Sequence, residues 1–173
     1  MQKKNQFKEA KGVIPEDMGP LEILEMGIYN EVSARDFYLS MGKKMKDTSG
    51  KKKFELLADD EKRHREILED WYRKESGGKD FTFNGEKVKR ITIEVKDHTS
   101  AFEAIDLALE AERQAYLFYS EAAKRAKEEK AKEMFMKLAE EEDGHYQKLS
   151  AERNALAGGF YWFGLDQAAP LEE

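Results

Sequence analysis

Apolar residues recur at alternating steps of three and four along several segments of the chain, a pattern that predicts amphipathic helices. The first predicted helix runs from Leu21 to about Lys46, and Pro20 suits the first helical position. The second runs from about Ser49 to Glu75, after turn and cap residues at 47–50. Ser76-Gly77-Gly78 then ends this helix.

The second half of the chain predicts two more helices. Ser100 and Glu103 form a capping box before the third helix, and Gly158-Gly159 ends the fourth. Between 79 and 98 apolar and polar residues alternate around Asn84-Gly85, which favours a linker that can hold a small β-hairpin. We therefore expect an all-α protein made of a loosely held arm at 1–19, a four-helix bundle at 20–157 with a crossover at 76–99, and a tail at 158–173.

Two polar residues interrupt the apolar face of the second helix. Glu61 and His64 fall between Leu57 and Leu68, at positions where the helical pattern calls for leucine. The pattern therefore predicts that both side chains point into the core. Burying an unpaired ionised group costs several kcal/mol, so these residues need partners there.

The chain contains an internal repeat, which shows where such partners come from. A shift of 81 residues without a gap superposes Glu31 on Glu112, Phe54 on Phe135, Glu61 on Glu142, His64 on His145 and Leu68 on Leu149. Two copies are too few for a solenoid, so the repeat predicts two helical hairpins that face each other in one bundle.

Each hairpin supplies one Glu from its first helix and a Glu-x-x-His pair from its second, where both side chains share a face. The candidate metal ligands are Glu31, Glu61, His64, Glu112, Glu142 and His145. The turn near residue 47 lies midway between Glu31 and the pair that follows it. In the second half the midpoint is near Glu128, where no Gly or Pro marks a turn; an unbroken helix would separate Glu112 from Glu142 by about 45 Å.

Small residues flank the two lone glutamates and leave room around the carboxylates, namely Gly27, Ala34, Ala108 and Ala115. Four carboxylates and two neutral imidazoles suit iron or manganese, and zinc can occupy the same positions. A single Glu-x-x-His is common on solvated helices, but two such pairs in matched register favour a metal site. A duplicated hairpin that has lost its site is the remaining alternative.

This ligand set resembles the di-iron carboxylate bundles of the ferritin-like superfamily, and rubrerythrin-like proteins most closely, over about residues 20–155. The resemblance implies two iron ions bridged by Glu61 and Glu142. It also implies that Glu31 and Glu112 are terminal ligands, while His64 and His145 each bind one iron.

Four further residues are candidates for supporting roles at such a site. Tyr38 and Tyr119 lie two turns beyond the lone glutamates and can donate hydrogen bonds to them, with ordinary core aromatics as the alternative. Asp60 and Glu141 can each orient a histidine of the neighbouring helix, as ligating imidazoles usually require, with solvated acids as the alternative.

The chain departs from typical rubrerythrins in two respects. They carry an extra Glu one turn from the third-helix ligand, where this chain has Leu109 and Ala115 in the flanking turns. They also carry a rubredoxin domain with a Cys-ligated iron, whereas this sequence contains no cysteine. We therefore expect an external electron-donor protein.

Charge and composition limit the partners and the cellular location that we expect for the protein. The net charge of -6 disfavours nucleic acid as a partner, and no apolar run approaches the length of a membrane span or a secretory signal. We expect a cytoplasmic homodimer without membrane association. The expected function is a non-haem di-iron oxidoreductase that reduces peroxide or O₂. The alternatives are an iron-binding ferroxidase-type protein without cage storage, and a helical interaction module with an incidental metal.

Overall fold

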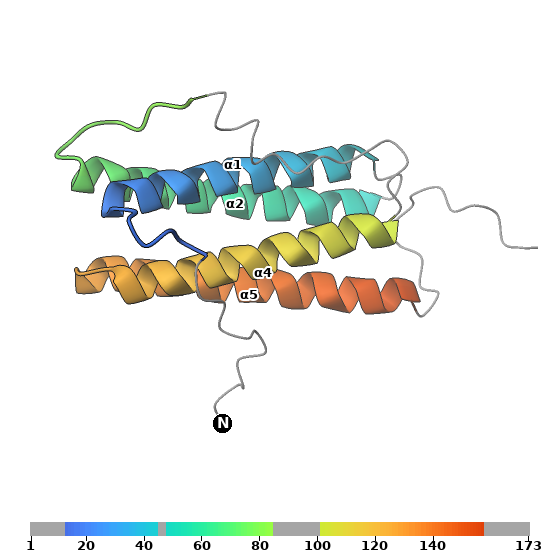
Figure 1. Ribbon diagram of the computed structural model, residues 1–173. Coiled ribbons are helices and arrows are strands. Elements are labelled where there is room, and N and C mark those ends of the chain that lie inside the picture. Colours follow the sequence, from blue (N-terminus) through green and yellow to red (C-terminus); the bar gives the residue numbers. More distant parts are fainter. Residues whose placement is uncertain (1–12, 45–47, 85–100, 158–173) are drawn as a thin grey trace, which may run out of the picture.

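The computed structural model describes residues 13–44, 48–84 and 101–157 of the chain. The described residues contain no strand and form four long helices: α1 (Pro20–Lys44), α2 (Thr48–Glu75), α4 (Ala101–Arg125) and α5 (Glu129–Ala157). Figure 1 shows α1 and α2 as one antiparallel hairpin that lies against a second hairpin of α4 and α5. The predicted all-α four-helix bundle is confirmed.

Local signals set the limits of α1. Pro20 is its first residue, and the Gly19 N–H just before it donates to the Glu22 carboxylate at 2.8 Å. This bond satisfies one of the backbone donors that a helix start leaves open. Lys43 and Lys44 in the last turn place positive charge at the negative end of the helix dipole.

Two glycines end α2. Gly77 and Gly78 have φ values of 71° and 99°, a region that side chains with a Cβ rarely adopt. The Gly78 N–H donates to the Arg73 carbonyl at 2.8 Å, which closes the last turn.

The second hairpin turns without Gly or Pro. α4 ends at Arg125 and α5 begins at Glu129, so the reversal takes three residues. The Ala126 N–H still donates to the Ala122 carbonyl at 2.9 Å, which continues the helical pattern into the turn. This reversal lies close to the midpoint that the spacing predicts, and it brings Glu112 and Glu142 to the same height.

Aromatic contacts fix the start of the crossover on the first hairpin. The Phe81 ring lies edge-on to Tyr29 at 5.4 Å and to Tyr72 at 5.3 Å between centroids. The Asn84 N–H donates to the Tyr29 hydroxyl oxygen at 2.8 Å. Residues 79–84 form no strand, and the rest of the segment in which we considered a β-hairpin lies outside the described residues, as does the 158–173 tail.

Residues 13–19, which we call the N-terminal segment, are held against α4 rather than loose. Ile14 is 1% exposed, and the Arg125 guanidinium donates to the carbonyls of Ile14, Pro15, Glu16 and Met18 at 2.9 to 3.2 Å. In Figure 1 this segment runs in blue from α4 to the start of α1. The remainder of the predicted arm lies outside the described residues.

The apolar core is divided into two clusters. One contains Phe37, Met41, Phe54, Ile105 and Leu149, and the other contains Ile14, Ile28, Leu68, Phe118 and Phe135. Buried glutamates and histidines occupy the middle of the helices between the two clusters. None of the described helices combines the length and the apolar character that a membrane span requires.

Candidate metal centre

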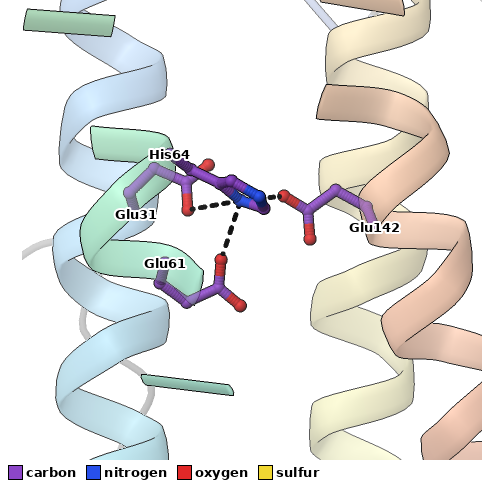
Figure 2. Close-up of side chains that lie close together, drawn as sticks. All are labelled: Glu31, Glu61, His64 and Glu142. Atoms are coloured by element: carbon purple, nitrogen blue, oxygen red, sulfur yellow. Dashed lines mark ion pairs between the residues drawn. The ribbon is translucent and has the colours of Figure 1, made fainter. Parts of the chain in front are cut away.

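All six candidate ligands are buried, and they come from all four helices. None is more than 3% exposed: Glu31 on α1, Glu61 and His64 on α2, Glu112 on α4, and Glu142 and His145 on α5. Figure 2 shows four of them, with the His64 ring reaching from the first hairpin to Glu142 of the second. The internal repeat therefore brings the chemically matched residues together at one height.

The first group of ligand atoms centres on His64. Its Nδ1 lies 3.0 Å from Glu142 Oε1, 3.1 Å from Glu61 Oε2 and 3.8 Å from Glu31 Oε2. One ligand atom from each of these four residues lies within 4.8 Å of the others. Three carboxylates and one imidazole thus surround a single point.

The second group mirrors the first around His145. Its Nδ1 lies 3.3 Å from Glu142 Oε2, 3.4 Å from Glu61 Oε1 and 3.5 Å from Glu112 Oε2. Glu61 and Glu142 belong to both groups and direct one oxygen to each histidine. The centre therefore consists of two adjacent four-ligand positions with two shared carboxylates.

Carboxylates on the neighbouring helix hold the outer nitrogens of both histidines. His64 Nε2 lies 2.8 Å from Glu141 Oε2, and His145 Nε2 lies 3.2 Å from Asp60 Oδ2. Since an ionised carboxylate can only accept, each Nε2 carries a proton. The Nδ1 atoms then face the centre, and once deprotonated each presents a lone pair there.

The two tyrosines bind the lone glutamates across the bundle. The Tyr38 hydroxyl donates to Glu112 Oε1, and the Tyr119 hydroxyl donates to Glu31 Oε1. The pairs cross because α1 and α4 are antiparallel and side chains lean toward the start of their own helix. Glu112 therefore leans toward Tyr38, whereas Glu31 leans away from it.

Without a metal, the buried groups hold protons that they would release in water. Burial raises the pKa of Glu31 to about 8, and burial together with the other carboxylates raises the pKa of Glu142. Burial also disfavours charge on Glu61, but attraction to His145 and His64 outweighs it and lowers the Glu61 pKa to about 2. Burial disfavours charged imidazoles too, yet the surrounding carboxylates raise both histidine pKa values. Protons therefore supply the positive charge that a cation would otherwise bring.

The donor atoms at the centre fit a pair of metal ions. Five buried atoms of the centre make no well-aligned hydrogen bond among the described residues and meet one another only as ion pairs: both oxygens of Glu61, Glu142 Oε1, His64 Nδ1 and His145 Nδ1. Orphaned polar atoms inside a core are costly, and metal coordination removes that cost. A mixed set of carboxylate oxygen and imidazole nitrogen is typical of iron and manganese sites.

A cavity of about 390 Å³ reaches the carboxylates from the side of α1 and α4. All four glutamates line it, together with small or apolar residues that include Ala34, Ala111, Ala115 and Phe118. Val13 of the N-terminal segment also lines the cavity. Of the four small residues expected to leave room around the carboxylates, Ala34 and Ala115 line this space, which holds a molecule much larger than one water. The expectation is wrong for the other two: a Cβ on Gly27 would lie 3.1 Å from Leu68 and 3.4 Å from Phe118, and Ala108 is packed in the apolar core.

Arg63 contacts both of the carboxylates that hold the histidines, and sequence analysis did not single it out. Its Nη2 lies 3.1 Å from Asp60 Oδ1 and 2.6 Å from Glu141 Oε2. Burial works to raise the pKa of Glu141, but the bonds from Arg63 and His64 lower it below its ordinary value. The sequence does place Arg63 three residues after Asp60, a spacing that favours an ion pair on a helix. The internal repeat gives no further support for Arg63, because Gly144 occupies the equivalent position in the second half.

Comparison with known proteins agrees with this geometry. A family model described as Rubrerythrin matches residues 22–153, most of the chain. The chain belongs to the rubrerythrin family. A solved structure of a hypothetical protein from Pyrococcus furiosus is 32% identical, covers 86% of this chain and 96% of its own, and superposes with a TM-score of 0.73. No curated protein matches the sequence.

Membership of the rubrerythrin family confirms the resemblance that the six-residue set suggested, and with it the ferritin-like form of the bundle. The buried cluster is compatible with the di-iron site that this resemblance implies. The chain thus combines the rubrerythrin fold with two histidine-centred groups at its middle.

Proposed function

We propose that this rubrerythrin-family protein is a non-haem di-iron oxidoreductase that reduces peroxide or O₂ with electrons from an external donor protein. The observation that carries the proposal is the pair of four-ligand groups that share Glu61 and Glu142 and open onto a cavity. Glu31 and His64 would complete one metal position, and Glu112 and His145 the other. A pair of ferrous ions held there would supply two electrons for cleavage of an O–O bond.

The chain's own residues position and protect such a centre. Tyr38 and Tyr119 hold Glu112 and Glu31 in place, and both hydroxyls lie next to the carboxylates at full burial. Burial and the nearby carboxylates raise both tyrosine pKa values, so each hydroxyl keeps its proton at neutral pH. Each protonated hydroxyl therefore donates to its carboxylate and fixes the position of that side chain.

The cavity has room for a small substrate. Its lining combines the four carboxylates with neutral side chains such as Ala34, Ala115 and Phe118. Peroxide and O₂ are small and neutral, so they enter such a space without losing a charged hydration shell. The carboxylates would also attract Fe(II), so the turnover test below separates the two functions.

The first test is metal content after anaerobic Fe(II) loading and desalting. We expect two irons per chain in the parent and none in the Glu61→Ala/Glu142→Ala variant. The matched control is Glu66→Ala/Glu140→Ala, which removes two exposed glutamates from the same helices and should retain two irons. Unchanged iron in the first variant would refute the assigned ligands.

The second test is turnover of the loaded protein with hydrogen peroxide and a reductase that regenerates the ferrous state. Repeated peroxide consumption would support the oxidoreductase. Oxidation of added Fe(II) without peroxide-dependent cycling would instead identify an iron-handling protein. Equal binding of manganese or zinc with no redox response would refute iron chemistry.

A further inference from the structure

The two halves of the candidate centre use different acids to hold their histidines, Asp60 and Glu141, and they also differ at an exposed position beside these acids. Arg63 lies on α2 with a side chain 44% exposed, and the 81-residue repeat places Gly144 of α5 at the equivalent point. A Cβ built on Gly144 meets no atom within 4 Å, so the space opposite Arg63 is open. One arginine therefore serves both halves.

The arginine does not contact the two histidine-holding carboxylates in the same way. Glu141 uses a single oxygen, Oε2, for both His64 Nε2 at 2.8 Å and Arg63 Nη2 at 2.6 Å. Asp60 uses separate oxygens, Oδ2 for His145 at 3.2 Å and Oδ1 for Arg63 at 3.1 Å. Arg63 therefore competes with His64 for the same oxygen of Glu141. His145 has Asp60 Oδ2 to itself, because Arg63 binds the other oxygen of Asp60.

We infer that Arg63 is a positioning residue that makes the two metal positions unequal, with the His64 position the weaker. A carboxylate bonded to the outer nitrogen of a histidine raises the basicity of the inner nitrogen toward the metal. A guanidinium that shares the accepting oxygen withdraws electron density from that bond. The contact of His64 with Glu141 (2.8 Å) is shorter than that of His145 with Asp60 (3.2 Å), which by itself would strengthen the His64 position. The Arg63 guanidinium lies closer still to the Glu141 oxygen, at 2.6 Å, and its positive charge outweighs this difference.

This inference rests on the proposed metal centre, and zinc sulfate with the full-length apo protein tests both. The chain has three histidines, so ¹⁵N imidazole spectra stay simple enough to follow His64 and His145 separately. In the parent we expect His145 to respond at a lower zinc concentration than His64, by up to about tenfold. If neither histidine responds, the metal centre itself is refuted.

Arg63→Ala isolates the arginine. We expect the gap between the two histidines, that is, the difference between the zinc concentrations at which His145 and His64 respond, to become smaller, because the His64 position gains affinity. The control is Arg73→Ala, which removes an arginine from the same helix that also pairs with an acid three residues earlier, Asp70, and should leave the gap unchanged. The inference is overturned if zinc fills both positions in the same order and with the same gap in Arg63→Ala as in the parent.

Moving the arginine separates its electrostatic effect from general packing. In Arg63→Ala/Gly144→Arg the repeat places the guanidinium beside Glu141 on its own helix and within reach of Asp60 across the bundle. We expect His64 to respond before His145, the reverse of the parent. Retention of the parental order in this variant also counts against Arg63 as the cause. A circular dichroism melt of each variant checks that the fold is kept.

Discussion

The metal-free protein should lose stability as the pH rises, because its core holds protons that alkaline conditions remove. Glu31 has a pKa near 8 in the folded state against 4.5 in the unfolded chain. A raised folded pKa contributes stability that is fully present below pH 4.5 and is lost as the pH climbs through 8. Both histidines have raised pKa values and act in the same direction, from their unfolded value of 6.5 upward.

The size of the loss follows from the Glu31 shift. A difference of about 3.5 pH units at 1.36 kcal/mol per unit gives a loss on the order of 5 kcal/mol between pH 4.5 and 8. Glu61 acts on the acid side, since its lowered pKa contributes stability above pH 4.5 that is lost as the pH falls toward 2. The metal-free protein should therefore be most stable near pH 4.5 and lose stability on either side, with the loss on the alkaline side steepening above 6.5 as the histidines contribute. A loss of this size is a large part of the 5–15 kcal/mol that typical domains possess.

Urea denaturation followed by circular dichroism measures this dependence. We expect the free energy of unfolding of the EDTA-treated protein to fall from pH 5.5 to pH 9. The metal-loaded protein should not show this fall, since bound cations replace the protons. Glu31→Gln mimics the protonated carboxyl and should flatten the slope, whereas Glu66→Gln, which changes an exposed glutamate, should not. A metal-free protein whose stability is constant or rises over this range would refute the reasoning.

Other substitutions test separate parts of the structure. Tyr119→Phe removes the donor to Glu31 and should lower the free energy of unfolding by about 1 to 3 kcal/mol, measured by urea denaturation. Ala115→Leu fills part of the cavity and should slow oxidation of the ferrous protein by peroxide about tenfold, or about 1.4 kcal/mol, at unchanged iron content; an unaltered rate would place the access route elsewhere. Arg125→Ala removes four hydrogen bonds to the N-terminal segment and should cost about 1 to 3 kcal/mol and speed its amide exchange; equal exchange would mean that burial of Ile14 and the hydrogen bond from Val13 N–H to Glu121 hold the segment without the arginine.

The buried cluster of six Glu and His residues was predictable because the repeat constrains it twice. Glu61 and His64 violate a helical apolar pattern, and the same violation recurs at Glu142 and His145. Helix bounds were also close to the prediction, with α2 at Thr48–Glu75 against an expected 49–75. Periodicity and cap residues act within one helix, so local sequence suffices for them.

Contacts between helices were less predictable. The spacing placed Tyr38 on the same face as Glu31 and predicted a hydrogen bond between them. The Tyr38 hydroxyl instead donates to Glu112 on the antiparallel helix α4. The four carbonyls that Arg125 gathers belong to residues more than a hundred positions earlier, and no pattern along the chain connects them. Such contacts depend on how elements are oriented in space, which hydrophobic periodicity does not encode.

Positions at which the two halves of the repeat differ indicate how the two metal positions can differ. Identical halves would give two equivalent metal positions, and the shared Glu61 and Glu142 come close to that condition. Arg63 opposite Gly144 breaks the equivalence at a point where an exposed charge reaches both histidines through one carboxylate each. A bimetallic centre that accepts electrons singly gains from unequal positions, because the two ions can then change oxidation state at different potentials. Arg63 is thus the exposed charge that would make the two metal positions of such a site unequal and order their oxidation.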